Sequence, residues 1–135
     1  ANSVVPKITI IIGNSFGAGN YAMCGKAYDP RFIYTYPNAK ISVMGGNQAS
    51  SVLLDIKLKQ EEKSGHKFSD EDKKKLLNDI LKSYDEKSTP LHAAARLWID
   101  EIINPSQTRE CISMCLEVAN NNPEIPKFNP GVIQT

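Results

Sequence analysis

The stretch KITIIIGNSFGAGNYAMCG, residues 7–25, joins a β-branched run to a turn rich in glycine and alanine. The run from Lys7 to Ile12 predicts a buried strand, because isoleucine and threonine favour extended backbone. The turn that follows fits two catalytic patterns. Gly13 to Gly17 reads G-x-S-x-G, the pattern of a serine nucleophile, and Gly17 to Ala22 reads G-x-G-x-x-A, the pattern of a dinucleotide-binding turn. The rest of the chain has to decide between them.

Neither catalytic pattern finds its usual partners. Ser15 follows a strand and precedes His92, as in serine hydrolases. However, only 14 residues precede Ser15, and His92 lies in an alanine-rich helical pattern typical of a packed or surface histidine. A dinucleotide-binding turn needs an acidic residue about 20 residues later, but the sequence has none between Asp29 and Asp55. Both interpretations are therefore weak.

A third interpretation uses the backbone of the turn. Glycine and alanine let the chain approach a ligand closely. Backbone N–H groups at the start of a helix point toward a bound anion. The turn would then stabilise an oxyanion. The alternative is a tight strand-to-helix turn that binds nothing.

Composition restricts the class of protein. The 135 residues fit one domain or a part of one. The net charge of +1 gives no reason to expect a nucleic acid or an anionic membrane as partner. No apolar run approaches the roughly 20 residues that span a bilayer. The chain begins without Met and runs almost at once into a strand, which suggests a fragment or a processed product.

The three cysteines, Cys24, Cys111 and Cys115, are too few and odd in number for a disulfide framework, and they favour a reducing compartment. Cys111 and Cys115 lie four residues apart on a predicted helix, so we expect two buried thiols on its apolar face, with Ile112, Leu116 and Ala119 beside them. Too few further ligands are present to predict a metal site.

The remaining pattern predicts an α/β or α+β order of elements. Ser69-Asp70-Glu71-Asp72 resembles a capping box that opens a helix, whose lysines at 73–75 we expect to form a solvated face. Asn104-Pro105 predicts the start of the last helix. The other expected elements are a helix at 20–27, strands at 32–36 and 41–44, a helix or strand at 48–63, a helix at 90–98, and a strand or extended segment at 99–103.

Two long segments resemble a known family. KITIIIGNSFGAGNYAMCGKAYDPRFIYTYPNAKISVMGGNQAS, residues 7–50, and AAARLWIDEIINPSQTRE, residues 93–110, resemble the C-terminal half of biotin-dependent acyl-CoA carboxyltransferases. The resemblance spans residues 4–120. It implies an α/β, crotonase-like ββα fold of the ClpP/crotonase superfamily. It also implies that residues 1–135 are the later portion of the C-terminal, biotin-side carboxyltransferase domain, without the acyl-CoA half.

The resemblance implies carboxyl transfer from carboxybiotin to an acyl-CoA, and it is strongest to the members that act on 3-methylcrotonyl-CoA. Other acyl-CoA carboxylases (propionyl- or geranyl-CoA), a glutaconyl-CoA-type decarboxylase and a non-catalytic assembly domain stay open. Met23, Met44 and Met114 lack the Met-Lys-Met context of a biotinylated lysine. The biotin is therefore expected on a partner α subunit, with further β subunits in a ring. The location would be the mitochondrial matrix in a eukaryote and the cytoplasm otherwise.

The resemblance also implies the site residues. The N–H groups of Ala18 and Gly19 would stabilise the ureido oxygen of biotin, which itself acts as the base. No side-chain nucleophile is needed, so Ser15 is expected to be structural. Asn47 and Asn104 replace acidic residues that relatives often carry. The expected biotin pocket is formed by Phe16, Gly17, Asn20, Tyr21, Ala22, Met23, Gly45 and Gly46.

Overall fold

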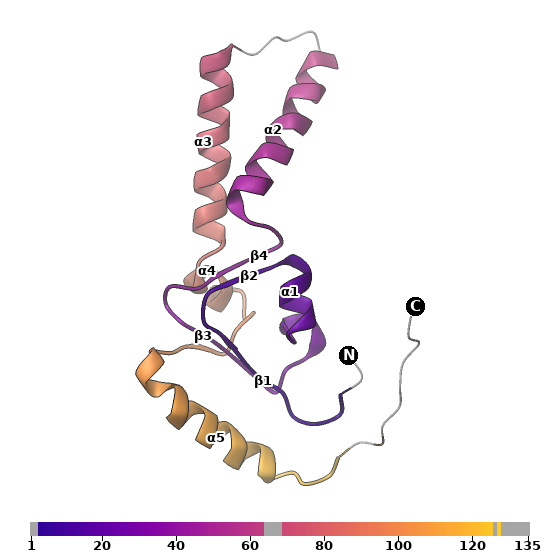
Figure 1. The fold of residues 1–135 in the computed structure, drawn as a ribbon, viewed down its shortest axis with the longest axis vertical. Coiled ribbons are helices and arrows are strands. Elements are labelled where there is room, and N and C mark those ends of the chain that lie inside the picture. Colours follow the sequence, from indigo (N-terminus) through magenta and orange to yellow (C-terminus); the bar gives the residue numbers. More distant parts are fainter. Residues whose placement is uncertain (1–2, 64–68, 126, 128–135) are drawn as a thin grey trace.

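Two consecutive strand–strand–helix units build the body of the protein, as Figure 1 shows for the computed structural model. The structure describes residues 3–63, 69–125 and 127. The first unit contains β1 (Ile8–Ile11), β2 (Asn14–Phe16) and α1 (Gly17–Ala22). After the short 3₁₀ helix η1 (Lys26–Tyr28), the second contains β3 (Phe32–Thr35), β4 (Lys40–Ser42) and α2 (Gly46–Lys63).

The two strands of each unit belong to different sheets. One sheet has the order β1-β3-β5, where β5 is Glu101–Ile102, and the other pairs β2 with β4. All of these pairs are parallel, with Ile10 opposite Tyr34 and Ser15 opposite Ile41. In the first sheet, β1 and β3 have the β-branched sequences that predict strands. β2, whose sequence is Asn-Ser-Phe, becomes a strand through its pairing with β4 and was not predicted.

The first helix differs from its prediction. The expected helix at 20–27 is wrong, because α1 begins at Gly17 and ends at Ala22. Cys24 then takes a left-handed backbone with φ of 61°. A left-handed residue cannot continue a right-handed α-helix, so the chain turns away before the glycine at 25. The glycine-rich turn is thus itself helical rather than a loop leading to a helix.

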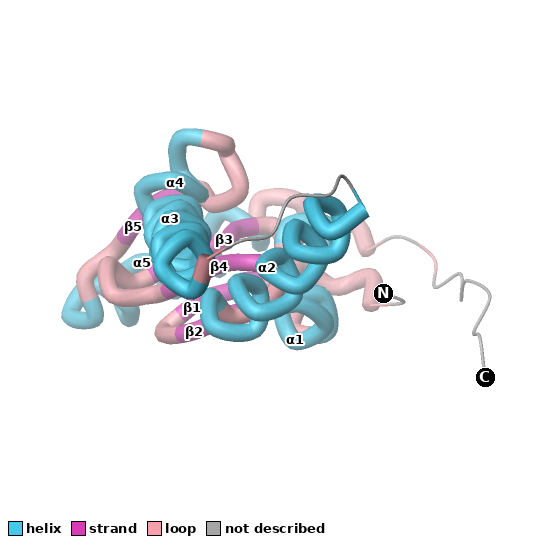
Figure 2. The backbone as a smooth tube through the Cα atoms, turned by 90° about the horizontal axis from the view of Figure 1, so that it is seen from above, coloured by secondary structure: helices cyan, strands magenta, loops and turns pink. Residues whose placement is uncertain are grey.

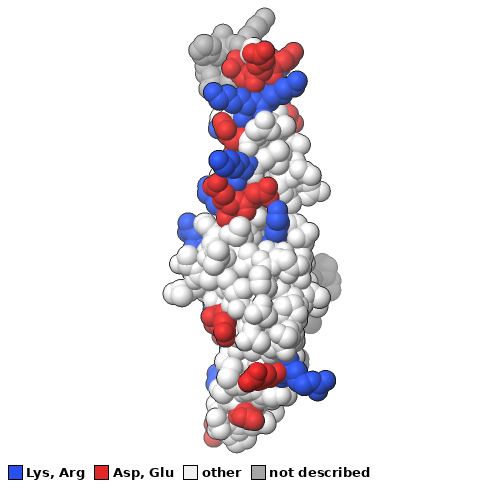
Figure 3. All heavy atoms as spheres, turned by 90° about the vertical axis from the view of Figure 1, so that its left-hand side faces the viewer, with Lys and Arg blue, Asp and Glu red and all other residues white. Residues whose placement is uncertain are grey.

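A long helical hairpin extends from this body. It consists of α2 and α3 (Asp70–Lys87), which contact each other near the body and diverge toward the far end (Figure 1). The segment 48–63 is therefore helical rather than a strand. Ser69 caps α3 as predicted, since its Oγ accepts a hydrogen bond from the Asp72 N–H at 3.2 Å. Figure 3 shows basic and acidic side chains interspersed over the hairpin, which supports the expected solvated face.

Two small apolar cores hold the body together. The first combines both sheets with α4 (Pro90–Ala95), and Figure 2 shows the strands between α4 and α1. The second packs the β1-β3-β5 sheet on α5 (Thr108–Asn120), which follows the 3₁₀ helix η2 (Pro105–Gln107). Buried residues of the first core are Ile11, Ile33, Ala39, Ala93 and Ile99, and those of the second are Tyr34, Ile103 and Cys115.

The cysteines of α5 match their expected surroundings only in part. Cys115 is fully buried and Cys111 is partly buried, and all three cysteines are free thiols. Leu116, expected on the buried face, is 52% exposed. The Tyr34 hydroxyl and Cys115 Sγ share a hydrogen bond of 3.2 Å. Burial, and then this hydrogen bond, raise the pKa of Tyr34 well above its usual value.

The segment after α4 also departs from expectation. The predicted helix at 90–98 ends earlier, at Ala95, and Leu97 adopts a left-handed backbone with φ of 58°. Asn104 opens η2 rather than α5 directly, and its N–H donates to Gln107 Oε1 at 2.9 Å. Of the helices in the described residues, none is long and apolar enough to cross a bilayer.

Candidate functional site

The turn at Gly17 favours glycine for two reasons, its backbone angle and its close contact with Val43. Its φ is +51°, a left-handed value that glycine adopts at little cost. A Cβ at this position would lie 2.9 Å from the carbonyl oxygen of Val43, in the segment that follows β4. The start of α1 is therefore pressed against the second unit.

The amides that follow Gly17 lie in the first turn of α1. Such amides have no acceptor inside their own helix. The N-cap residue is Phe16, and within the described chain no side chain caps the helix there. Ala18 and Gly19 are both exposed, and a Cβ on Gly19 would have no described heavy atom within 4 Å. The first turn of α1 thus borders open space.

Ser15 is engaged by a neighbour of its own unit. Asn20 Nδ2 donates a hydrogen bond to Ser15 Oγ at 2.8 Å. His92, the partner that a hydrolase would need, accepts a hydrogen bond at Nε2 from Arg96 Nε at 2.8 Å. No Ser15–His92 hydrogen bond occurs between these two described residues, so the geometry does not support a serine nucleophile.

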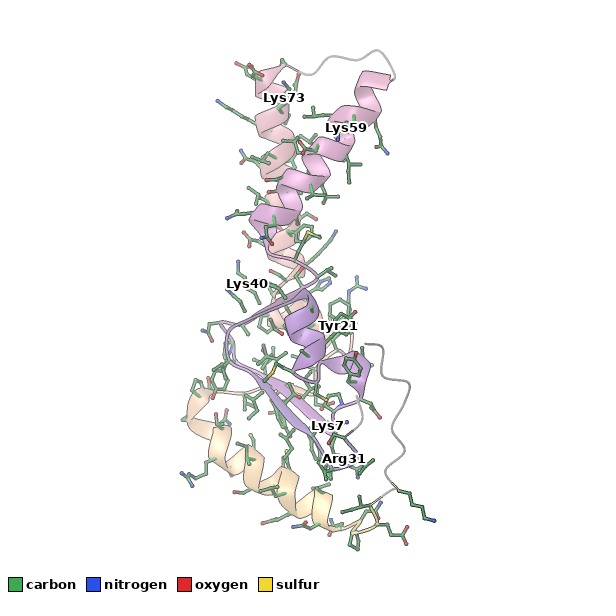
Figure 4. All side chains as sticks on the ribbon, turned by 45° about the vertical axis from the view of Figure 1, so that its right-hand side comes forward. Lys7, Tyr21, Arg31, Lys40, Lys59 and Lys73 are labelled. Atoms are coloured by element: carbon green, nitrogen blue, oxygen red, sulfur yellow. The ribbon has the colours of Figure 1, made fainter. Side chains whose placement is uncertain are left out.

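A cavity of about 710 Å³ lies between α1, the end of β4, the end of α3 and α4. Among the residues predicted from sequence, Gly17, Asn20 and Tyr21 line it, and Figure 4 shows Tyr21 on α1 below the hairpin. The other lining residues are Ile11, Lys26, Ala27, Ile33, Ile41, Ser42, Val43, Tyr84, Lys87, His92, Arg96, Trp98 and Ile99. This volume is in the range of small-molecule sites.

The cavity wall opposite α1 is basic and aromatic. The Arg96 guanidinium lies 5.8 Å from the Trp98 ring centroid, and the His92 ring lies 5.9 Å from the same ring, edge on. Lys26 and Lys87 also line the cavity, and among the described residues that line it none is Asp or Glu. Such a wall suits a ligand that carries negative charge. This wall was not predicted from sequence, although the four-residue spacing of His92 and Arg96 places both on one helical face.

The other predicted site residues lie around this cavity rather than in its wall. Ala22 and Met23 are exposed at the end of α1. Gly45 and Gly46 open α2, where the Gly45 carbonyl accepts the Ala49 N–H at 2.9 Å. A Cβ on Gly45 would lie 3.9 Å from the Phe16 ring. Gly45 thus adjoins the N-cap of α1, whereas Gly46 faces Leu81 and Tyr84 of α3. Among the described residues, no group of three potential metal ligands is found.

The fold and site together define a class of protein. Successive ββα units whose strands enter two parallel sheets are the architecture of crotonase-like carboxyltransferase β subunits. The solved β subunit of *Pseudomonas aeruginosa* geranyl-CoA carboxylase superposes with a TM-score of 0.76 and 38% identity, over 98% of this chain and 24% of that one. A family model described as "Carboxyl transferase domain" matches residues 1–133. The chain belongs to the carboxyl transferase domain family.

Curated relatives agree with this assignment. The chain is 48% identical over 118 residues to the probable mitochondrial methylcrotonoyl-CoA carboxylase beta chain of *Drosophila melanogaster*, covering 87% of this chain and 20% of that protein. It is 44% identical to the biotin-dependent 3-methylcrotonyl-coenzyme A carboxylase beta1 subunit of *Mycobacterium tuberculosis*, covering 88% of this chain and 22% of that protein. The chain therefore spans about a fifth of the length of these relatives.

Proposed function

We propose that this chain is the biotin-side part of an acyl-CoA carboxyltransferase, and that its acyl-CoA substrate is 3-methylcrotonyl-CoA. Membership of the carboxyl transferase domain family supports the reaction class. The two relatives above, whose names carry methylcrotonyl-type substrates, support the substrate. The geranyl-CoA carboxylase subunit supports only the broader class, because its name carries another acyl group.

The first turn of α1 would hold the ureido oxygen of biotin. When bound, biotin supplies the carboxyl group and the base of the reaction. The N–H groups of Ala18 and Gly19 donate hydrogen bonds to the oxygen on which negative charge develops. Donors fixed in advance stabilise such charge without reorganising at the moment of reaction. Gly17 would hold these donors in place, since its positive φ and its close approach to the Val43 carbonyl favour glycine there.

The residues present fit such a group. The open space beside Gly19 leaves room for a planar ring to approach the backbone. The exposed first turn of α1, which no side chain caps, is the single observation that carries this part of the proposal. The adjoining cavity, whose described lining includes Lys26, Lys87 and Arg96 but no carboxylate, offers a favourable environment for an anionic partner. Gly45, Gly46 and Phe16 would border the bound ring from the side of α2.

Gly19→Pro in the intact carboxylase tests this function. Proline removes one N–H donor yet is tolerated in the first turn of a helix. Loss of one oxyanion donor lowers kcat by about 100-fold or more. Gly19→Ala is the matched variant, since it keeps the N–H, and we expect it to keep far more turnover. Carboxyl transfer is measured with radiolabelled bicarbonate. Equal turnover of the two variants would contradict the proposed role of the amide.

A substrate comparison tests the acyl group. The intact enzyme is offered 3-methylcrotonyl-CoA, geranyl-CoA, propionyl-CoA and glutaconyl-CoA in separate assays of carboxyl exchange with biotin. We expect the highest kcat/KM with 3-methylcrotonyl-CoA. A preference for geranyl-CoA would keep the class and change the substrate. Exchange with none of them would favour the non-catalytic assembly role.

The proposed reaction needs partners that this chain does not supply. Biotin would arrive on an α subunit, and further β subunits would complete the ring and provide the acyl-CoA half. The *Drosophila* relative is named as mitochondrial. In a eukaryote we therefore propose the mitochondrial matrix as the location. Copurification of a biotinylated protein with the full-length chain, detected with streptavidin, tests the first of these partners.

A further inference from the structure

We propose that Asn20 is a positioning residue, which fixes the Ala18 and Gly19 amides by binding Ser15 in the neighbouring strand. This inference rests on the proposed function and assigns the motif Ser15 a role in it. Asn20 lies in α1 immediately after Gly19, and Ser15 lies in β2, so their side chains connect the helix to the sheet.

The contact to Ser15 ties α1 to a fixed element. Asn20 Nδ2 donates to Ser15 Oγ at 2.8 Å across a partly buried boundary. Ser15 itself is the middle residue of β2 and pairs with Ile41 of β4. A strand that is paired in a sheet moves little. The hydrogen bond from the Asn20 side chain therefore fixes α1 relative to that sheet.

Asn20 is held from the opposite side by Gly25. The Gly25 N–H donates to the Asn20 carbonyl at 2.8 Å. Gly25 is buried, and a Cβ there would overlap the Asn20 side chain. Glycine at this position therefore leaves the space that the asparagine side chain occupies. β2 and the turn at Gly25 therefore both contact Asn20 of α1 and limit its movement.

Few other contacts can fix this helix. α1 has only 6 residues, and none of them is buried. A helix this short is not stable by itself. The turn at Gly17 fixes its first residue, but the direction of the helix depends on further contacts. Tyr21 makes an edge-on ring contact with Tyr28 of η1, and Asn20 makes the hydrogen bond to the sheet. An error of 1 Å in the position of a catalytic donor can lower a rate by about 100-fold.

This arrangement explains the G-x-S-x-G pattern without a nucleophile. The Ser15 hydroxyl accepts a hydrogen bond from an amide, and no base is needed to activate it. Threonine would keep the acceptor oxygen, whereas alanine would remove it. Loss of Ser15 Oγ should cost less than loss of the Asn20 side chain, because Asn20 would still pack against Gly25.

The test measures kcat and the KM for acyl-CoA in the intact carboxylase. We expect Asn20→Ala to lower kcat by about 10- to 100-fold without changing KM. Ser15→Ala should lower kcat by about 3-fold, and Ser15→Thr should restore most of it. The double variant should be no slower than Asn20→Ala alone, because both changes remove the same contact. Asn38→Ala, in the exposed turn between β3 and β4, is the control with unchanged kcat.

A second readout does not depend on turnover. Amide hydrogen exchange of Met23, whose N–H donates to the Gly19 carbonyl at 3.1 Å, should be faster in Asn20→Ala than in the wild type, whereas exchange in β3 should be unchanged. Should Asn20→Ala fail to fold, the milder Ser15→Ala variant carries the same two measurements with smaller changes.

The outcomes separate this inference from the proposed function. Wild-type kcat and wild-type exchange in Asn20→Ala would overturn the positioning role, while an inactive Gly19→Pro would leave the proposed function intact. A slow Asn20→Ala with wild-type behaviour of Ser15→Ala would also overturn it, since Asn20 would then act without Ser15. Full turnover of Gly19→Pro would count against the proposed function, whatever Asn20→Ala does.

Discussion

The two ββα units share one topology but use their helices differently. In both units the first strand enters the β1-β3-β5 sheet, the second enters the β2-β4 sheet, and a helix begins at or near a glycine. α1 stops after 6 residues and buries none of them, whereas α2 runs for 18 residues and packs along α3. A short helix leaves its first amides accessible to a ligand. A long helix with a packing partner serves the structure.

The largest expected difference lies between the glycines that open the two helices. Gly17→Ala places a Cβ against the Val43 carbonyl and forces alanine to a positive φ, so it should destabilise the protein by about 2 kcal/mol. Gly46→Ala meets only ordinary contacts at 3.9 Å with Leu81 and Tyr84. It should be neutral or stabilising by up to about 1 kcal/mol. Urea unfolding of the two variants measures both changes, and equal effects would refute the contrast between the units.

A smaller loss of stability is expected from changes to the contact between the β1-β3-β5 sheet and α5. Tyr34 of the second unit faces Ile10 of the first in the ladder and shares a hydrogen bond with Cys115. Tyr34→Phe removes a buried hydroxyl and should cost about 1 kcal/mol. Tyr36→Phe is the matched variant, because its hydroxyl bonds Thr108 Oγ1 at 2.6 Å in a partly buried place that water can reach. Its cost should be lower in the same urea unfolding experiment.

Loss of the N-cap of α3 should affect only the start of that helix. Ser69→Ala removes the N-cap and should weaken the first turn by about 1 kcal/mol. Amide exchange should rise at Asp72 and Lys73, whose N–H groups bond Ser69, with carboxyl transfer unchanged, because α3 begins at the end of the hairpin that is far from α1 (Figure 1). Lost activity would show that the hairpin and the α1 amides are coupled.

Lowering the pH should weaken the same contact between Ser69 and Asp72. Hydrogen bonds from Ser69 hold the pKa of Asp72 below its ordinary value of 3.8. Because this pKa is lowered in the folded state, the ionised Asp72 carboxylate stabilises the fold fully at pH values above the ordinary pKa. This stabilisation is lost as the pH falls through the folded-state pKa. The Asp72 amide chemical shift, followed by NMR from pH 6 downward, should change below the pH expected of a free aspartate. In Ser69→Ala this midpoint should move up toward the ordinary value.

The smallest change is expected at the junction of hairpin and body. Lys40 Nζ and Asp85 Oδ1 lie 2.6 Å apart, and their side chains are 47% and 66% exposed. Figure 4 shows Lys40 where β4 meets the hairpin. Asp85→Asn should change the free energy of unfolding by less than about 1 kcal/mol, since water screens such pairs. The comparison at 0.1 M and 1 M salt checks this. A larger loss that persists at high salt would mean that the pair holds the hairpin in place.

Local sequence was enough for several elements. The β-branched runs of β1 and β3 and the Ser69–Asp72 capping box act over a few residues, so their pattern is visible in the chain itself. The family was also readable from sequence, because its motifs cover most of the chain. The same holds for the choice of Ala18 and Gly19 as the amides to test, which stays a prediction carried by that resemblance.

Tertiary structure decided the rest, because the deciding contacts join residues far apart in the chain. β2 is a strand only because it pairs with β4, some 26 residues later. The basic residues Lys26, Lys87 and Arg96 line one cavity only because η1, the end of α3 and the end of α4 come together in the fold. The sequence indicated which turn matters, whereas the tertiary structure determined that this turn is helical and exposed, that Gly17 abuts Val43 of the second unit, and that Asn20 bonds Ser15.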